Sequence, residues 1–136
     1  MAQHNLPDPY FSIVIPAFNR EKEIVRAIDS CLTQSFQDFE VLVVDDASTD
    51  GTAAVVSAVT DPRLRLIRHP VNRNVCPARN TGSANSRGDW VVFLDSDDIL
   101  LPGALQTMWR YARVCPAEIG QLGFLLERED GRISPE

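Results

Sequence analysis

The 136-residue sequence predicts an α/β protein, an open and mostly parallel β-sheet flanked by helices. Short runs of apolar, β-branched residues alternate with amphipathic segments, which is the pattern of repeated strand–loop–helix units. The strand candidates are apolar on both faces, as parallel strands covered by helices are. This length favours one domain. We place it over residues 11–136, after an N-terminal extension over residues 1–10.

The first half of the chain predicts two strand–helix units followed by a third strand. Strands are expected over residues 11–15, 39–44 and 64–67, and helices over residues 21–35 and 52–59. Pro16 ends the first strand, and Pro62 stops the second helix. Ile24, Ile28 and Leu32 recur at a helical spacing in the first helix, so one face of it is expected to pack on the sheet.

The second half continues the alternation and ends in a hairpin. Helices are expected over residues 77–86 and 102–114, and strands over residues 90–94 and 122–127. Gly88 closes the first of these helices, and Pro102 opens the second. Asp130-Gly131 indicates a tight turn, after which residues 132–134 form a short return strand. The predicted sheet therefore looks unfinished at this edge.

Composition excludes several classes of protein. The net charge is −6 and the basic residues are scattered, which argues against a nucleic-acid-binding surface. Cys31, Cys76 and Cys115 are odd in number and widely spaced, which argues against a disulfide framework or a zinc site and favours a reducing cytoplasm. The first residues lack the pattern of a signal peptide, and no apolar stretch approaches the roughly 20 residues of a membrane span.

Polar residues gather where three of the strands end. Residues 16–21, 45–51 and 95–98 follow the first, second and fourth strands, and the last two segments hold six of the 12 aspartates. Ligands of open parallel sheets bind beyond the carboxyl ends of the strands. Like charges about 4 Å apart near a surface repel by roughly 4 kcal/mol, so either the carboxylates spread into water or a cation neutralises them. Oxygen ligands without His or Cys favour Mg²⁺ or Mn²⁺, shared with a diphosphate.

Each segment also has a plainer interpretation. Residues 45–51 could be an Asx turn that caps the next helix through Ser48 or Asp50. Their likeness to a calcium-binding EF-hand loop fails because Ser57 stands at the twelfth position. Residues 95–98 could be a solvated loop, Arg79 could be an ordinary polar helix residue, and His69 a surface residue at a strand end.

Four blocks together resemble glycosyltransferase family 2. They are Ser12-Ile-Val-Ile-Pro-Ala-Phe-Asn19, Val43-Val-Asp-Asp-Ala-Ser-Thr-Asp-Gly-Thr52, Ala78-Arg-Asn-Thr-Gly82 and Gly88-Asp-Trp-Val-Val-Phe-Leu-Asp-Ser-Asp-Asp98. The resemblance covers about residues 10–134, and it implies the nucleotide-sugar-binding portion of a GT-A (Rossmann-like) fold, apparently truncated.

The resemblance also implies roles for individual residues. The predicted nucleotide-sugar ligands are Pro16, Ala17, Asn19, Glu21, Asp46, Arg79 and Asp95. Asp46 would accept a hydrogen bond from the base, Arg79 would lie near the base or diphosphate, and Asp95 near the ribose. Asp97 would bind the metal ion, Mg²⁺ or Mn²⁺, with Asp98 as a neighbouring or alternative ligand.

The implied reaction transfers a sugar from a nucleoside diphosphate, with a UDP-sugar as the leading donor, to a hydroxyl of a saccharide or lipid-linked acceptor. The anomeric carbon inverts, and the general base is expected beyond Glu136, so no base is assigned here. The resemblance further implies a role in cell-envelope polysaccharide synthesis, in the cytoplasm or at the inner face of the membrane.

Other functions remain to be weighed. A non-catalytic nucleotide-sugar-binding module or inactive fragment would keep the pocket without turnover, and a homodimer could close the open sheet edge. A phosphoacceptor receiver domain would need an acidic pair after its first strand, where Pro16 stands, and a Lys after the fifth, whereas Lys22 is the only Lys. A sugar-phosphate nucleotidyltransferase would need a Gly-rich, basic loop after the first strand.

Overall fold

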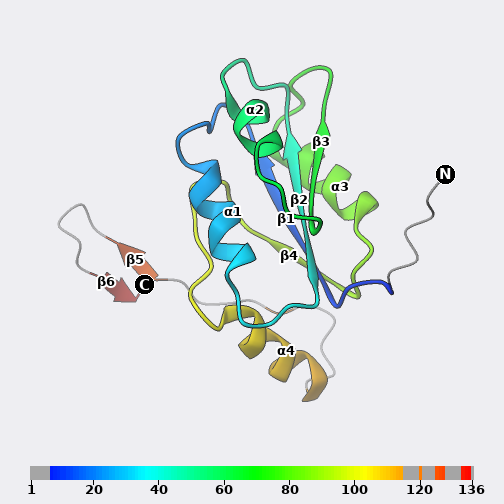
Figure 1. Ribbon diagram of the computed structural model, residues 1–136, viewed down its shortest axis with the longest axis vertical. Coiled ribbons are helices and arrows are strands. Elements are labelled where there is room, and N and C mark those ends of the chain that lie inside the picture. The colour runs from blue at the N-terminus through cyan, green and yellow to red at the C-terminus, as the bar shows by residue number, and fades with distance from the viewer. Residues whose placement is uncertain (1–6, 115–119, 121–124, 128–132, 136) are drawn as a thin grey trace. The chain divides into compact units, whose positions relative to one another are not determined.

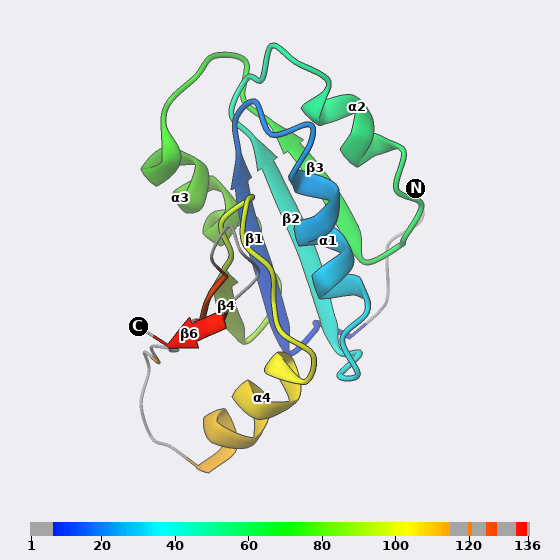
Figure 2. The same ribbon diagram turned by 90° about the vertical axis from the view of Figure 1, so that its left-hand side faces the viewer.

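A computed structural model describes residues 7–114, 120, 125–127 and 133–135 of the chain. It forms two compact units, residues 1–106 and 107–136, which are considered separately. The predicted class is confirmed, since a four-stranded parallel sheet in the order β3-β2-β1-β4 is flanked by helices. In Figures 1 and 2, α1 and α2 cover one face of the sheet and α3 covers the other.

The elements alternate as expected, with shifts of a few residues at their ends. The strands of the main sheet are β1 (Phe11–Ala17), β2 (Phe39–Asp45), β3 (Leu64–Arg68) and β4 (Trp90–Phe93). The helices are α1 (Ile24–Leu32), α2 (Thr52–Ser57), α3 (Val75–Asn85) and α4 (Ala104–Val114). None of the helices among the described residues is long and apolar enough to cross a membrane.

The central strand β1 runs two residues past its predicted end and passes through Pro16. Successive residues of a strand direct their backbone N–H and C=O groups to opposite neighbouring strands, so residues two apart face the same neighbour. The Val14 carbonyl accepts from Leu94 N on the β4 side, whereas the Ala17 carbonyl accepts from Asp46 N on the β2 side. Pro16 therefore faces β4, whose paired residues end level with Val14. Its missing N–H is not needed there, and the strand continues.

The core lies between β1, β2 and the helices. Ile13, Val14 and Ile15 of β1 are fully buried, as is all of β2 between Val41 and Val44. Helix α3 packs very closely on this layer, because a Cβ added to Gly82 would lie 2.2 Å from Val14 Cγ1. Glycine is required there by close approach rather than by a turn.

The apolar strand β4 is less buried than the sequence predicts. Val91 and Phe93 are 37% and 49% exposed, because within the described sheet β4 is an edge strand paired with β1 alone. The predicted hairpin is present. The described part of the fifth strand, β5 (Leu125–Glu127), pairs antiparallel with the return strand β6 (Ile133–Pro135) in a separate two-stranded sheet. The predicted turn at residues 130–131 lies outside the described residues.

A buried charge cluster fastens the amino-terminal edge of the sheet. Glu40, only 2% exposed, accepts hydrogen bonds from Ser12 Oγ at 2.7 Å and from Arg87 N and Nη2 at 2.8 Å each. Burial alone would raise the pKa of Glu40, but these hydrogen bonds and the charge of Arg65 hold the pKa below its ordinary value. The cluster ties the segment before β4 to β1 and β2.

Candidate functional site

The loops that follow β1 and β2 are joined by hydrogen bonds at the carboxyl edge of the sheet. Asn19 N donates to Ser48 Oγ at 2.9 Å, and Asn19 Oδ1 accepts from Thr49 N at 2.9 Å. Glu21 Oε2 accepts from Gly51 N at 2.7 Å. The side chains of Asn19 and Glu21, both predicted nucleotide ligands, are thus engaged in holding one loop against the other.

Two residues of these loops have left-handed backbone conformations. The φ angles are +51° for Asn19 and +63° for Ala47. Asn visits this region readily, whereas for Ala it costs roughly 1–2 kcal/mol, so the surrounding contacts must impose it. One such contact spans Ala47, where Ser48 N donates to Asp45 Oδ1 at 3.2 Å. Farther along the same loop, Asp50 accepts from Thr52 Oγ1 and N, and from Glu21 N. The loops are therefore held in a fixed shape before any ligand binds.

Asp46 is buried, and both of its carboxylate oxygens are engaged. They accept from Arg73 N at 3.0 Å, from Asn74 N at 2.7 Å and from the His69 ring at 2.6 Å. Burial would raise the pKa of Asp46, but these three donors hold the pKa below its ordinary value. The carboxylate is therefore charged at neutral pH. It satisfies backbone amides just before α3, where a helix leaves donors unpaired.

His69 is buried, so the sequence interpretation of it as a surface residue is wrong. Only 8% of it is exposed, and both ring nitrogens are within hydrogen-bond distance of partners. Nδ1 lies 2.6 Å from Asp46 Oδ1, and Nε2 lies 2.8 Å from Thr81 Oγ1 on α3. The end of β3 and helix α3 are thereby linked through one imidazole ring.

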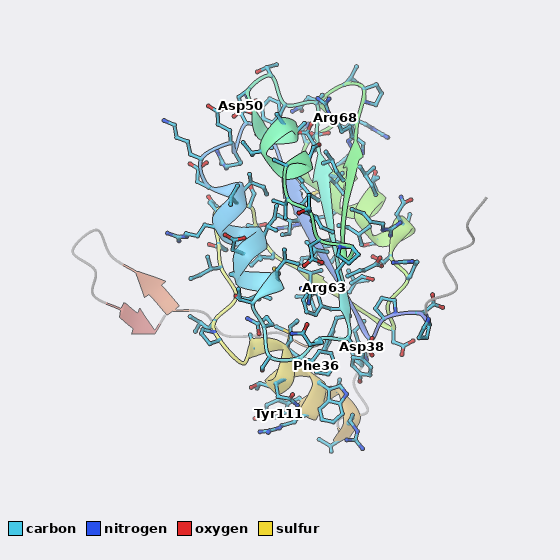
Figure 3. All side chains as sticks on the ribbon, viewed as in Figure 1. Phe36, Asp38, Asp50, Arg63, Arg68 and Tyr111 are labelled. Atoms are coloured by element: carbon cyan, nitrogen blue, oxygen red, sulfur yellow. The ribbon has the colours of Figure 1, made fainter. Side chains whose placement is uncertain are left out.

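A hollow of about 460 Å³ lies beside these groups. It is lined by Ala47, Ser48, Arg68, His69 and Pro70. Arg68 is anchored in it, because its Nε donates to the fully buried Asp45 carboxylate at 2.9 Å. Figure 3 places Arg68 and Asp50 at this carboxyl edge, and Asp38 and Arg63 toward the opposite end of the sheet.

The acidic segment after β4 meets Arg79 of α3. Arg79 Nη2 donates to Asp95 Oδ1 at 2.7 Å, and its guanidinium carbon lies 5.7 Å from the centre of the Phe93 ring. Partial burial, followed by the neighbouring charges of Asp97 and Asp95, raises the pKa of Asp98. The three carboxylates therefore repel one another, and a cation beside them would relieve that repulsion.

Strand register relates the two acidic segments. Ala17 lies opposite Asp45 of β2, and Val14 lies opposite Phe93 of β4. Continuing both registers places Asp46 and Asp95 two residues apart in height and two strand spacings apart across the sheet. That is roughly 7 Å along and roughly 10 Å across, or roughly 12 Å between their backbones. The two acidic segments share one edge, although the hollow is lined only by residues that follow β2 and by residues at and just after the end of β3.

No group of three or more His, Cys, Asp or Glu side chains forms a metal cage among the described residues. The chemistry of the acidic segment still suits a hard cation, since its donors are carboxylate oxygens and Mg²⁺ commonly takes only one or two of them. Asp97 and Asp98 are exposed and available for this role, whereas one oxygen of Asp95 is paired with Arg79.

The structure adds functional candidates that sequence reasoning missed. Phe18, directly after β1, is 43% exposed, so its ring is accessible to a ligand at this edge of the sheet. The sequence could have indicated Phe18, because it lies between Ala17 and Asn19, two predicted nucleotide ligands. Of the described cysteines, Cys76 is exposed near the start of α3, whereas Cys31 is buried. Burial raises the pKa of the Cys31 thiol to about 12, so it is inert.

Comparison with known proteins agrees with this arrangement. Residues 12–124 match the family described as "Glycosyl transferase family 2". The chain is 43% identical over 124 residues to "Succinoglycan biosynthesis protein ExoO" of Rhizobium meliloti (strain 1021), an alignment that covers 91% of this chain and 36% of that protein. It is 36% identical over 132 residues to "GalNAc(5)-diNAcBac-PP-undecaprenol beta-1,3-glucosyltransferase" of Campylobacter jejuni, covering 94% and 42%.

Solved structures of similar fold carry nucleotide-sugars. One is S. aureus TarS 1–349 in complex with UDP-GlcNAc, with a TM-score of 0.72 and 28% identity over 82% of this chain and 37% of that one. Another is the mannosyltransferase PcManGT from Pyrobaculum calidifontis in complex with GDP-Man and Mn²⁺, with a TM-score of 0.73 and 28% identity over 85% and 36%. This chain spans roughly two fifths of the length of these relatives, with shares of 36% to 42%. With the family match extending over most of its residues, the chain belongs to glycosyltransferase family 2.

Proposed function

We propose that this chain is the donor-binding portion of an inverting glycosyltransferase, which holds a nucleoside-diphosphate sugar and a divalent cation. The observation that carries the proposal is the crowded acidic segment beside Arg79, where the pKa of Asp98 is raised by partial burial and two neighbouring carboxylates. This segment lies at the same sheet edge as the braced loops after β1 and β2. A diphosphate and a cation together match these charges, whereas a neutral ligand would not.

The nucleoside would lie over the tip of β1. Phe18 offers an exposed ring for stacking, which is worth roughly 1–3 kcal/mol per base. Pro16 and Ala17 would line the pocket with backbone, and Asn19 and Glu21 would keep that backbone in place through their bonds to the neighbouring loop. Asp46 would accept a hydrogen bond from the base only through carboxylate oxygens that already accept from Arg73 N, Asn74 N and the His69 ring.

The diphosphate would lie toward β4. Arg79 can turn from Asp95 to a phosphate oxygen, because its side chain is 38% exposed, and Asp95 would then be released toward the ribose. Asp97 and Asp98 would hold Mg²⁺ or Mn²⁺. Bound there, the ion would act as a Lewis acid for the charge on the departing diphosphate.

The acceptor hydroxyl would attack the anomeric carbon from the face opposite the diphosphate, so the configuration inverts. Its proton must go to a general base. We assign that base to the second half that longer family members possess, together with the acceptor site for a saccharide or lipid-linked saccharide. A UDP-sugar is the leading donor, since one structural neighbour is described in complex with UDP-GlcNAc. The reaction would take place in the cytoplasm or at the inner membrane face.

Calorimetric titration with UDP, and separately with GDP, tests the proposal. In the presence of Mn²⁺ one of them should bind, and a ligand at 100 times its dissociation constant should raise the unfolding free energy by about 2.7 kcal/mol. A chelator should weaken this binding in the wild type. The metal dependence should vanish in Asp97→Asn and persist in Asp89→Asn, an exposed carboxylate at the opposite end of β4. Equal behaviour of the two variants would refute the metal assignment.

A non-catalytic binding module is the alternative from a different class. Incubation with UDP-sugars and Mn²⁺, followed by detection of free UDP, separates the two functions. Release of UDP by sugar transfer or hydrolysis supports an enzyme. Binding without any release supports the module, and the absence of binding to either nucleotide refutes both.

A further inference from the structure

His69 connects the two sides of the candidate site. Its ring is buried, with Nδ1 at 2.6 Å from Asp46 Oδ1 and Nε2 at 2.8 Å from Thr81 Oγ1. Asp46 follows β2, whereas Thr81 belongs to α3, the helix that also carries Arg79. No other side chain among the described residues bonds with both the segment after β2 and helix α3.

The direction of these hydrogen bonds follows from the chemistry of Asp46. Its carboxylate already accepts from Arg73 N and Asn74 N, and it is ionised, so it can only accept from the ring. Nδ1 must therefore carry the hydrogen. In the neutral ring Nε2 is then an acceptor, and the Thr81 hydroxyl donates to it. Both partners fix the orientation of the ring.

The ring therefore joins helix α3 to the segment after β2. Side chains two residues apart on a helix point to different sides, so Thr81 can affect Arg79 only through the backbone of α3, which also packs on Val14 at Gly82. Arg79 Nη2 reaches Asp95 in the acidic segment at 2.7 Å. The link thus runs by hydrogen bonds from Asp46 through the ring to Thr81, then through the backbone of α3 to Arg79, and by a further hydrogen bond to Asp95 after β4.

We propose that His69 is a positioning residue of the nucleotide-sugar site, which sets the placement of Arg79 relative to the loop after β2. The inference rests on the proposed function for its effect on binding. Its effect on Arg79 does not depend on any ligand. The ring touches neither diphosphate nor metal in this role, and acts only through Asp46 and Thr81.

Three variants separate the hydroxyl contact from general stability. Thr81→Val keeps the shape of the side chain and removes the donor. His69→Asn retains an amide that can donate to Asp46 but cannot reach Thr81. Thr81→Ser keeps the hydroxyl and should restore wild-type behaviour. Ser83→Ala, at an exposed position of the same helix, is the control for changes in α3 itself.

Two measurements decide the proposal. In the ligand-free protein, the NMR signal of the buried Arg79 Nε–H should move in Thr81→Val and His69→Asn and stay in place in Thr81→Ser and Ser83→Ala. In UDP and GDP titrations with Mn²⁺, the first two variants should each bind about tenfold more weakly, and the double variant no more weakly than either, because both remove one interaction.

An unchanged Arg79 signal in Thr81→Val overturns the positioning role, and so does additive weakening in the double variant. Failure of the wild type to bind either nucleotide would instead overturn the proposed function. The Arg79 signal would still decide the role of His69.

Discussion

Replacing Gly82 with Ala tests the packing that brings helix α3 to the site. The added Cβ would lie 2.2 Å from Val14 Cγ1 and 3.0 Å from Cγ2. Carbon atoms normally stay about 3.5–4.0 Å apart, so the helix or the strand must yield by more than roughly 1 Å. Val14 is fully buried in the central strand, which leaves the helix as the part that moves.

The net effect is a balance of two free energies. Overpacking costs roughly 1–3 kcal/mol, here at the upper end, whereas Ala gains about 1 kcal/mol over Gly in a helix. Gly82→Ala should therefore lower the unfolding free energy by about 2 kcal/mol, which moves the urea midpoint down by about 1 M. Ser83→Ala, which is exposed on the same helix, should leave stability unchanged or slightly increased. A Gly82→Ala protein as stable as the wild type would refute the packing argument.

Three other predictions follow from contacts at either edge of the sheet. The pKa of Glu40 is lower in the folded state than its ordinary 4.5, so the stabilisation is complete above that pH and is lost as pH falls through the folded value. Acid unfolding of Glu40→Gln should therefore show a flatter pH dependence, and an unchanged one would contradict the buried charge cluster. Phe18→Ala should weaken nucleoside diphosphate binding at least about tenfold in calorimetry, while Phe18→Tyr keeps it, as base stacking requires; equal loss in both would count against stacking. Asn19→Ala should be about 1 kcal/mol less stable to urea than Asn19→Gly, since only Gly accepts the left-handed backbone without strain; a reversed order would disprove the strain.

The order of elements was predictable because hydrophobic periodicity is local. The spacing of Ile24 and Ile28 identified α1, and the apolar run from Phe39 identified β2. Acidic segments at one sheet edge followed from parallel topology alone. The continuation of β1 through Pro16 was not predictable, because it depends on where β4 stops alongside it.

Side-chain directions were the least predictable part of the site. Nothing local distinguishes a buried His69, bonded to Asp46 and Thr81, from an exposed one at the end of a strand. The same holds for Asn19, whose amide oxygen is taken by Thr49 of a loop about 30 positions away. Such contacts form only once the sheet has brought distant segments together, so they cannot be predicted from composition and residue spacing.

The position of β1 in the middle of the sheet determines the order in which the sheet can form as the chain is synthesised. Of the four strands of this sheet, β1 leaves the ribosome before the others, and its two sides are filled by β2 and then by β4, whose Trp90 pairs with Phe11. Contacts between residues so far apart in the chain form slowly, since a long loop must close first. Within this sheet, the part of the edge that carries Asp95 and Asp97 is therefore assembled last, and a nascent chain that stops before β4 has the loops after β1 and β2 without the acidic segment.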